Sequence, residues 1–137
     1  MSDGPAHGRP SGPALLDAWP YARFLGVRLE AGDSGPIAVL PFAERLIGNP
    51  VLPALHGGAL ASFLELAALA RLDAEGRPAR TIDITVDYLR SARPTATFAQ
   101  ARILKLGRRA ANLSVEAWQD DRGSPVAALR GHFLILG

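Results

Sequence analysis

The chain has 137 residues, enough for one domain with a sizeable core. Its 48% hydrophobic and 20% charged residues are typical of a globular protein, and the absence of cysteine excludes disulfides and thiolate chemistry. The net charge of +2 is uneven, because residues 90–137 hold eight arginines and lysines against only three acids. So small a basic excess favours an anionic small molecule over a nucleic-acid duplex, with a solvated basic face as the alternative.

Neither a metal site nor a membrane segment is predicted. His7, His56 and His132 show no spacing typical of metal ligands. The N-terminus lacks an apolar signal core, and the most apolar stretch is too short, and too interrupted by Glu65, to cross a bilayer. We therefore expect a cytoplasmic protein without a metal or a separate cofactor.

The first part of the chain is rich in turn-forming residues. Residues 1–13 are dominated by Gly, Pro and Ser, which predicts a disordered tail before a single domain over residues 14–137. Residues 14–25 are compatible with a short helix that Pro20 would interrupt and Gly26 would end.

The remaining chain predicts strands on both sides of one long helix. The expected strands are residues 27–31, 37–41, 81–89, 95–106, 110–119 and 125–136, with a loop over 42–55. Strict alternation in the third of these strands places two sets of side chains on opposite faces. The sets are Ile82, Ile84, Val86 and Tyr88 against Thr81, Asp83, Thr85 and Asp87.

The long helix begins after His56-Gly57-Gly58 and continues to about Asp73. The segment after the glycines consists of helix formers without proline or β-branched residues, and it is apolar on every side. Its first polar residue after Ser62 is Glu65, about two turns in. A buried carboxylate must be paired, protonated or used in chemistry.

A helix that is apolar all round needs cover on every face. An antiparallel sheet of about six strands wrapped around one long central helix supplies that cover, so the sequence predicts an α+β hotdog fold. The edge strands of such a sheet favour pairing with another subunit. We expect a homodimer or a homotetramer.

The motifs resemble those of hotdog-fold acyl-CoA thioesterases of the phenylacetate-degradation and hydroxybenzoyl-CoA type. The resemblance covers residues 24–136 and rests on His56-Gly57-Gly58, the acid nine residues after His56, and two further stretches. Those stretches are Val86-Asp87-Tyr88-Leu89-Arg90 with Ala92-Arg93-Pro94, and Lys105-Leu106-Gly107-Arg108-Arg109. The resemblance implies an enzyme that hydrolyses an acyl-CoA or acyl-carrier thioester.

The resemblance also implies roles for individual residues. Glu65 takes the place of the general base or nucleophile, and the Gly57 amide that of the group polarising the thioester carbonyl. His56 matches a residue that shapes the turn, and Thr81 lies near the place of a hydroxyl that a partner subunit brings to the acid. Asn49 resembles a further site residue, although it lies one position farther from His56 than the pattern requires, and Arg45, Ala54 or Leu55 could reach the same space.

Coenzyme A, as part of the substrate, needs cations for its phosphates. The candidates for contacting substrate are Gly58, Arg90, Lys105, Arg108 and Arg109. Three of these cations flank the turn at Gly107. The alternative is that these charges are merely solvated.

Other interpretations stay open. Glu65 could be a buried acid paired with Arg71 or with an arginine on a strand. The protein could be a hotdog hydratase or dehydratase in which His56 and Glu65 act together on the carbons of a thioester. It could also be a module that binds acyl-CoA without turnover. No nucleic-acid or membrane partner is expected.

Overall fold

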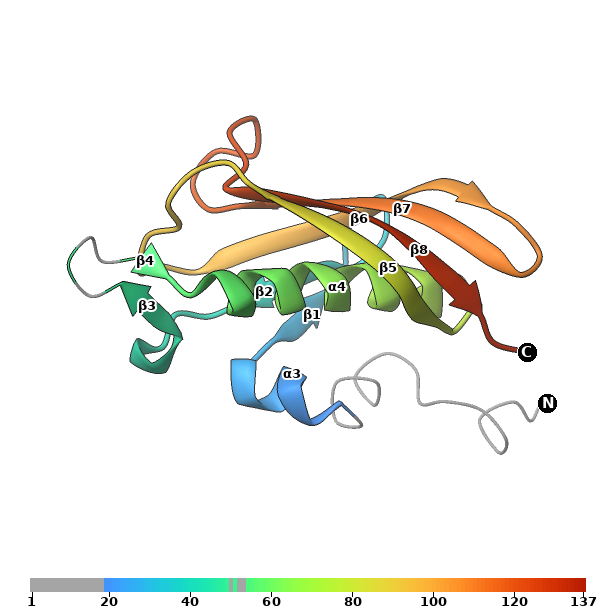
Figure 1. Cartoon of the computed structure of the whole chain (residues 1–137), viewed down its shortest axis with the longest axis horizontal. Coiled ribbons are helices and arrows are strands. Elements are labelled where there is room, and N and C mark those ends of the chain that lie inside the picture. The colour runs from blue at the N-terminus through green and yellow to red at the C-terminus, as the bar shows by residue number, and fades with distance from the viewer. Residues whose placement is uncertain (1–18, 50, 52–53) are drawn as a thin grey trace.

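A six-stranded antiparallel sheet lies along one long helix in the computed structural model, which describes residues 19–49, 51 and 54–137. The sheet covers one side of the helix, and a short helix lies on the other side (Figure 1). This arrangement confirms the predicted hotdog fold. The tail predicted over residues 1–13 lies outside the described residues.

The order of the strands across the sheet differs from their order in the chain. Across the sheet the strands are β1 (Arg28–Glu30), β2 (Ile37–Leu40), β6 (Thr97–Leu106), β7 (Ala110–Trp118), β8 (Ala127–Ile135) and β5 (Ala79–Tyr88). Every neighbouring pair is antiparallel. Within the described residues β5 pairs only with β8, so one edge of this ten-residue strand has no partner strand.

The long helix α4 spans Gly57–Ala74, close to the predicted bounds. Its eighteen residues correspond to about 27 Å at 1.5 Å per residue. Large side chains from the helix and the sheet are fully buried together: Phe63, Leu64, Leu66, Leu72, Leu113, Val115 and Phe133. Burying each of these stabilises the fold by about 1.5–3 kcal/mol. The helix is not buried all round, because Ala61, Ser62 and Glu65 form a partly exposed stripe.

Two short elements differ from the predictions. Helix α3 (Pro20–Leu25) begins at Pro20, which the sequence analysis expected to interrupt it. Proline suits the first helical position because the N–H that it lacks would have no partner there. Gly26 ends α3 in the left-handed conformation, as predicted (φ 77°). The expected loop over 42–55 contains a 3-10 turn (Glu44–Leu46) and the ribbon of β3 (Ile47–Asn49) and β4 (Ala54–Leu55).

A β-bulge corrects the predicted faces of β5. Thr81 pairs with Phe133 and Asp83 with His132, so Ile82 is an extra residue without a partner of its own. Thr81 therefore lies on the same face as the partly buried Ile84, three positions later, instead of opposite to it. Ile82, predicted to face the core, is 54% exposed. The bulge turns the Thr81 side chain toward α4.

Candidate active site

The turn before α4 is held from both sides. The His56 backbone N–H donates to the Leu46 carbonyl at 2.6 Å, which ties the start of the helix to the end of the 3-10 turn. A Cβ added at Gly48 would lie 2.9 Å from the His56 Cα, so only glycine permits β3 to approach this closely. The β3–β4 ribbon, absent from the sequence prediction, thus positions His56.

His56 is the N-cap of α4. Its Nδ1 accepts a hydrogen bond from the Gly58 N–H at 2.9 Å. The neutral ring then carries its proton on Nε2, which leaves an N–H donor at the exposed side of the turn. The N–H groups of the first helical turn have no partner within the helix. No described residue accepts a hydrogen bond from the Gly57 N–H.

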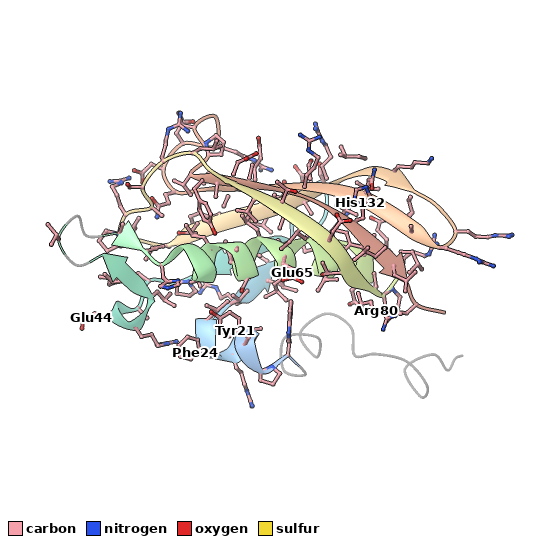
Figure 2. All side chains as sticks on the ribbon, viewed as in Figure 1. Tyr21, Phe24, Glu44, Glu65, Arg80 and His132 are labelled. Atoms are coloured by element: carbon pink, nitrogen blue, oxygen red, sulfur yellow. The ribbon has the colours of Figure 1, made fainter. Side chains whose placement is uncertain are left out.

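Glu65 lies midway along α4 and is partly buried (Figure 2). The Thr81 hydroxyl donates to Glu65 Oε2 at 2.6 Å, and this contact is made within one chain. Oε1 makes no hydrogen bond to any described residue. One carboxylate oxygen is therefore oriented while the other is free to contact water or a substrate.

No cation neutralises Glu65 among the described residues. Arg71, the local alternative, instead bonds Glu75 through Nε at 3.1 Å and the Ser34 carbonyl through a terminal nitrogen at 2.6 Å. The interpretation of Glu65 as half of an ion pair with Arg71 is therefore wrong.

The structure gives the place of each residue that the sequence analysis considered for the space beside the turn. Asn49 ends β3 and pairs with Ala54, two residues before His56, so its backbone lies beside the turn. Arg45 is turned away from it, because its guanidinium donates twice to the Phe24 carbonyl, at 2.9 and 2.6 Å. Ala54 and Leu55 are buried in β4.

The predicted cations lie at opposite ends of α4. Arg90 lines a hollow of about 370 Å³ together with Gly57, Leu60 and Tyr88. Lys105 lies near the end of β6, and Arg108 and Arg109 lie in the β6–β7 turn. The Gly107 carbonyl of this turn accepts a hydrogen bond at 2.8 Å from Arg77, just beyond the end of α4. The three cations of the turn are therefore separated from Gly57 by about the 27 Å length of the helix.

One residue of the site has no role in the sequence analysis. The Tyr88 hydroxyl donates to the Gly57 carbonyl at 2.8 Å. Tyr88 belongs to one of the motif stretches, but its alternation predicted only an inward-facing aromatic residue. The hydrogen bond depends on where the end of β5 meets the start of α4, and no local sequence pattern encodes that meeting.

The described residues contain no cluster of three His, Asp or Glu side chains suited to a metal ion. His132 instead lies 2.8 Å from Asp83 through Nδ1, on the face of the sheet turned away from α4 (Figure 2). None of the described helices has the length and apolar character needed to cross a bilayer.

Comparison with known proteins assigns the family. The thioesterase superfamily matches residues 52–126. The chain is 31% identical to YigI of Salmonella typhimurium, a medium/long-chain acyl-CoA thioesterase, over 75% of this chain and 77% of YigI. A crystal structure from Chromobacterium violaceum has 37% identity and a TM-score of 0.72, covering 91% of this chain and 89% of its own. PaaI of Escherichia coli, from the phenylacetic acid degradation operon, shares the fold at 20% identity, with a TM-score of 0.78 over 90% and 89% of the chains. The protein therefore belongs to the thioesterase superfamily and is a thioester hydrolase.

Proposed function

We propose that this enzyme hydrolyses acyl-CoA thioesters, with Glu65 as general base or nucleophile and the Gly57 amide as oxyanion donor. The observation that carries the proposal is the hydrogen bonding of the Glu65 carboxylate. The Thr81 hydroxyl fixes one of its oxygens, and the other oxygen has no hydrogen-bond partner among the described residues. A carboxylate so placed can deprotonate a water or attack the thioester carbonyl. The N-terminus of α4 carries a partial positive charge, and no described residue accepts a hydrogen bond from the Gly57 N–H. Both features would stabilise the thioester oxygen as it becomes negative during the reaction.

The geometry favours hydrolysis over hydration of a double bond. A hydratase would use His56 and Glu65 as a pair on the substrate carbons. Here His56 Nδ1 accepts a hydrogen bond from the Gly58 N–H, so this ring nitrogen is not free to act as a base on the substrate carbons. His56 is better suited to donate from Nε2 to a carbonyl that binds at the turn.

The two halves of the machinery lie too far apart to act on one carbonyl within a protomer. Gly57 and Glu65 are eight residues apart in α4, about 12 Å along its axis. The oxyanion and the attacked carbon of one thioester are directly bonded, so both groups must come within about 3–3.5 Å of neighbouring atoms. We therefore assign each site to two chains, with Gly57 from one and Glu65 from the other.

Strand β5 supplies a surface for that assembly. Its free edge carries unpaired backbone N–H and C=O groups, which a second copy of β5 can satisfy by antiparallel pairing about a twofold axis. The resulting homodimer would place the β6–β7 turn of one chain at the same end of the assembly as Gly57 of the other. This gives Lys105, Arg108 and Arg109 a route to the coenzyme A phosphates, beside Arg90. Pairing of two such dimers would give the tetramer.

The carboxylate is tested by Glu65→Gln, which preserves size but removes the base and nucleophile. We expect kcat to fall at least ~10²-fold with little change in KM. The melting temperature, measured on the same preparation, should hold or rise, because a partly buried charge is gone. Near-wild-type turnover would overturn the mechanism, and binding without turnover of any acyl-CoA from acetyl to long-chain in the wild type would indicate a binding module instead. Hydration of a crotonyl thioester without release of the thiol would indicate a hydratase.

A further inference from the structure

Two side chains from outside α4 hold one peptide group at its start. The Gly57 carbonyl accepts from the Tyr88 hydroxyl at 2.8 Å, and the Gly58 N–H donates to His56 Nδ1 at 2.9 Å. These two atoms are the two ends of the same peptide group, between Gly57 and Gly58. The peptide that follows the oxyanion donor is therefore fixed at both its oxygen and its nitrogen.

The hydrogen bond from Tyr88 exceeds what the helix needs. The carbonyl of the first helical residue already receives an N–H from four residues later in an α-helix. The hydrogen bond within the helix already satisfies this oxygen, so the Tyr88 hydroxyl is a second donor to it; the Tyr88 side chain itself is 55% exposed. The Tyr88 hydroxyl instead restrains the orientation of the Gly57 carbonyl, which the single hydrogen bond within the helix would leave less well fixed.

The glycines explain why such a restraint is useful. A Cβ at Gly57 would lie 3.4 Å from two carbons of the Tyr88 ring, and one at Gly58 would lie 3.0 Å from His56 Cε1. The approach at Gly58 is tight, whereas the one at Gly57 is an ordinary van der Waals contact. Glycine also has the greatest backbone freedom of any residue, so two in succession form a soft start for a helix.

The neighbouring peptide, which carries the Gly57 N–H, is held on its other side. The His56 N–H is bonded to Leu46, and the His56 carbonyl accepts from the Leu60 N–H at 3.2 Å. The torsion angles of Gly57 are the remaining freedom between two fixed peptide groups. The Gly57 Cα joins these two peptide groups. A tilt of the Gly57–Gly58 peptide in the absence of the Tyr88 hydroxyl would therefore shift this Cα and displace the Gly57 nitrogen and its N–H.

We infer that Tyr88 is a positioning residue of the thioesterase, whose hydroxyl keeps the Gly57 N–H in place at the thioester oxygen by holding the Gly57 carbonyl and, through it, the Gly57 Cα. This inference rests on the proposed function, because it assigns to Tyr88 an action through the oxyanion donor. Tyr88 also lines the hollow that contains Gly57, so it borders the space where a carbonyl would meet that amide.

The test is Tyr88→Phe, which removes only the hydroxyl. We expect kcat to fall about tenfold, less than the ~10²–10³-fold for complete loss of an oxyanion donor, with KM changed less than about twofold. The melting temperature should stay unchanged because the ring is half exposed. Tyr21→Phe is the matched control, since Tyr21 is the other tyrosine of the chain and lies on α3, stacked on Phe24 (Figure 2).

A double variant shows whether Tyr88 acts through Gly57. In Gly57→Pro, which lacks the N–H, adding Tyr88→Phe should cause no further loss of kcat, since the group that Tyr88 orients is absent. Additive losses would overturn the inference, as would a rise in KM at constant kcat or a loss of stability at constant kcat. Failure here is distinct from failure of the proposed function: if Glu65→Gln is inactive while Tyr88→Phe is fully active, the mechanism stands and the role of Tyr88 does not.

Discussion

A site shared between two chains can be tested by combining two inactive variants. Gly57→Pro removes the oxyanion donor at a position where helices accept proline. His56, with φ −66° and ψ 131°, already has the extended conformation that a residue before proline requires, and the added ring would meet Tyr88 at ordinary contact distance. Glu65→Gln removes the carboxylate. Each homodimer should lose at least ~10²-fold in kcat.

The expected recovery follows from the assignment of the site. Gly57 and Glu65 of one chain are about 12 Å apart along α4, so in the proposed site Gly57 comes from one chain and Glu65 from the other. A mixed dimer then has one site with both groups intact and one site with neither. Random assembly of equal amounts makes about half of the dimers mixed, which gives about a quarter of the wild-type activity.

The assay is release of free thiol from a saturating acyl-CoA after the two variants, carrying different tags, are co-expressed. Co-expression of Glu65→Gln with wild type, expected to retain about half of the activity, calibrates the mixing. Activity that stays at the level of the separate variants, in a preparation shown to contain mixed dimers, would refute the shared site. Full activity of a monomer in light scattering would refute it as well.

Three further predictions concern His56, Thr81 and the pair Arg108 and Arg109. His56→Ala should lower the free energy of unfolding by about 1 kcal/mol, or Tm by about 3–5 °C, because the N-cap is lost. His56→Asn should restore Tm but not kcat. Recovery of both Tm and kcat in His56→Asn would limit the role of His56 to capping the helix. Thr81→Val should lower kcat about tenfold, because the charged Glu65 carboxylate loses the hydrogen bond that orients it. Thr81→Ser, which keeps the hydroxyl, should retain activity. Equal kcat values for the two variants would contradict the orienting role of Thr81. Replacing Arg108 and Arg109 together with Gln should raise the Kd for coenzyme A more than for a truncated pantetheine thiol, with a smaller effect at high salt; equal changes for both ligands would show that these arginines do not contact phosphate.

The central helix could be predicted because its signals are local. Residues 57–74 combine helix formers with two glycines and a capping His56, and each of these acts within a few positions of itself. The isolation of Glu65 was also visible in the sequence, since no acid or base lies three or four residues away to pair with it. The structure adds that Arg71 is occupied by Glu75 and by the Ser34 carbonyl.

The contacts that orient the site could not be predicted in the same way. Strict alternation placed Thr81 opposite Ile84, and only the register of β5 against β8 shows that Ile82 is extra. The β3–β4 ribbon is stabilised by its contacts with the start of α4, and two- and three-residue strands leave no periodic pattern. The sequence analysis named Arg90 together with the three cations around Gly107 as candidate contacts for coenzyme A, whereas the fold separates Arg90 from the β6–β7 turn.

Strand β5 joins the separate parts of this site. Near its beginning, the bulge at Ile82 brings the Thr81 hydroxyl to Glu65, and its last residue, Tyr88, bonds the Gly57 carbonyl. The same strand is the free edge of the sheet on which a second chain can pair. If β5 pairs with its copy, the backbone that carries both hydroxyls is restrained from two sides instead of one. Dimer formation would then do more than bring Glu65 of one chain to Gly57 of the other, because it would also stiffen the strand that orients each of them.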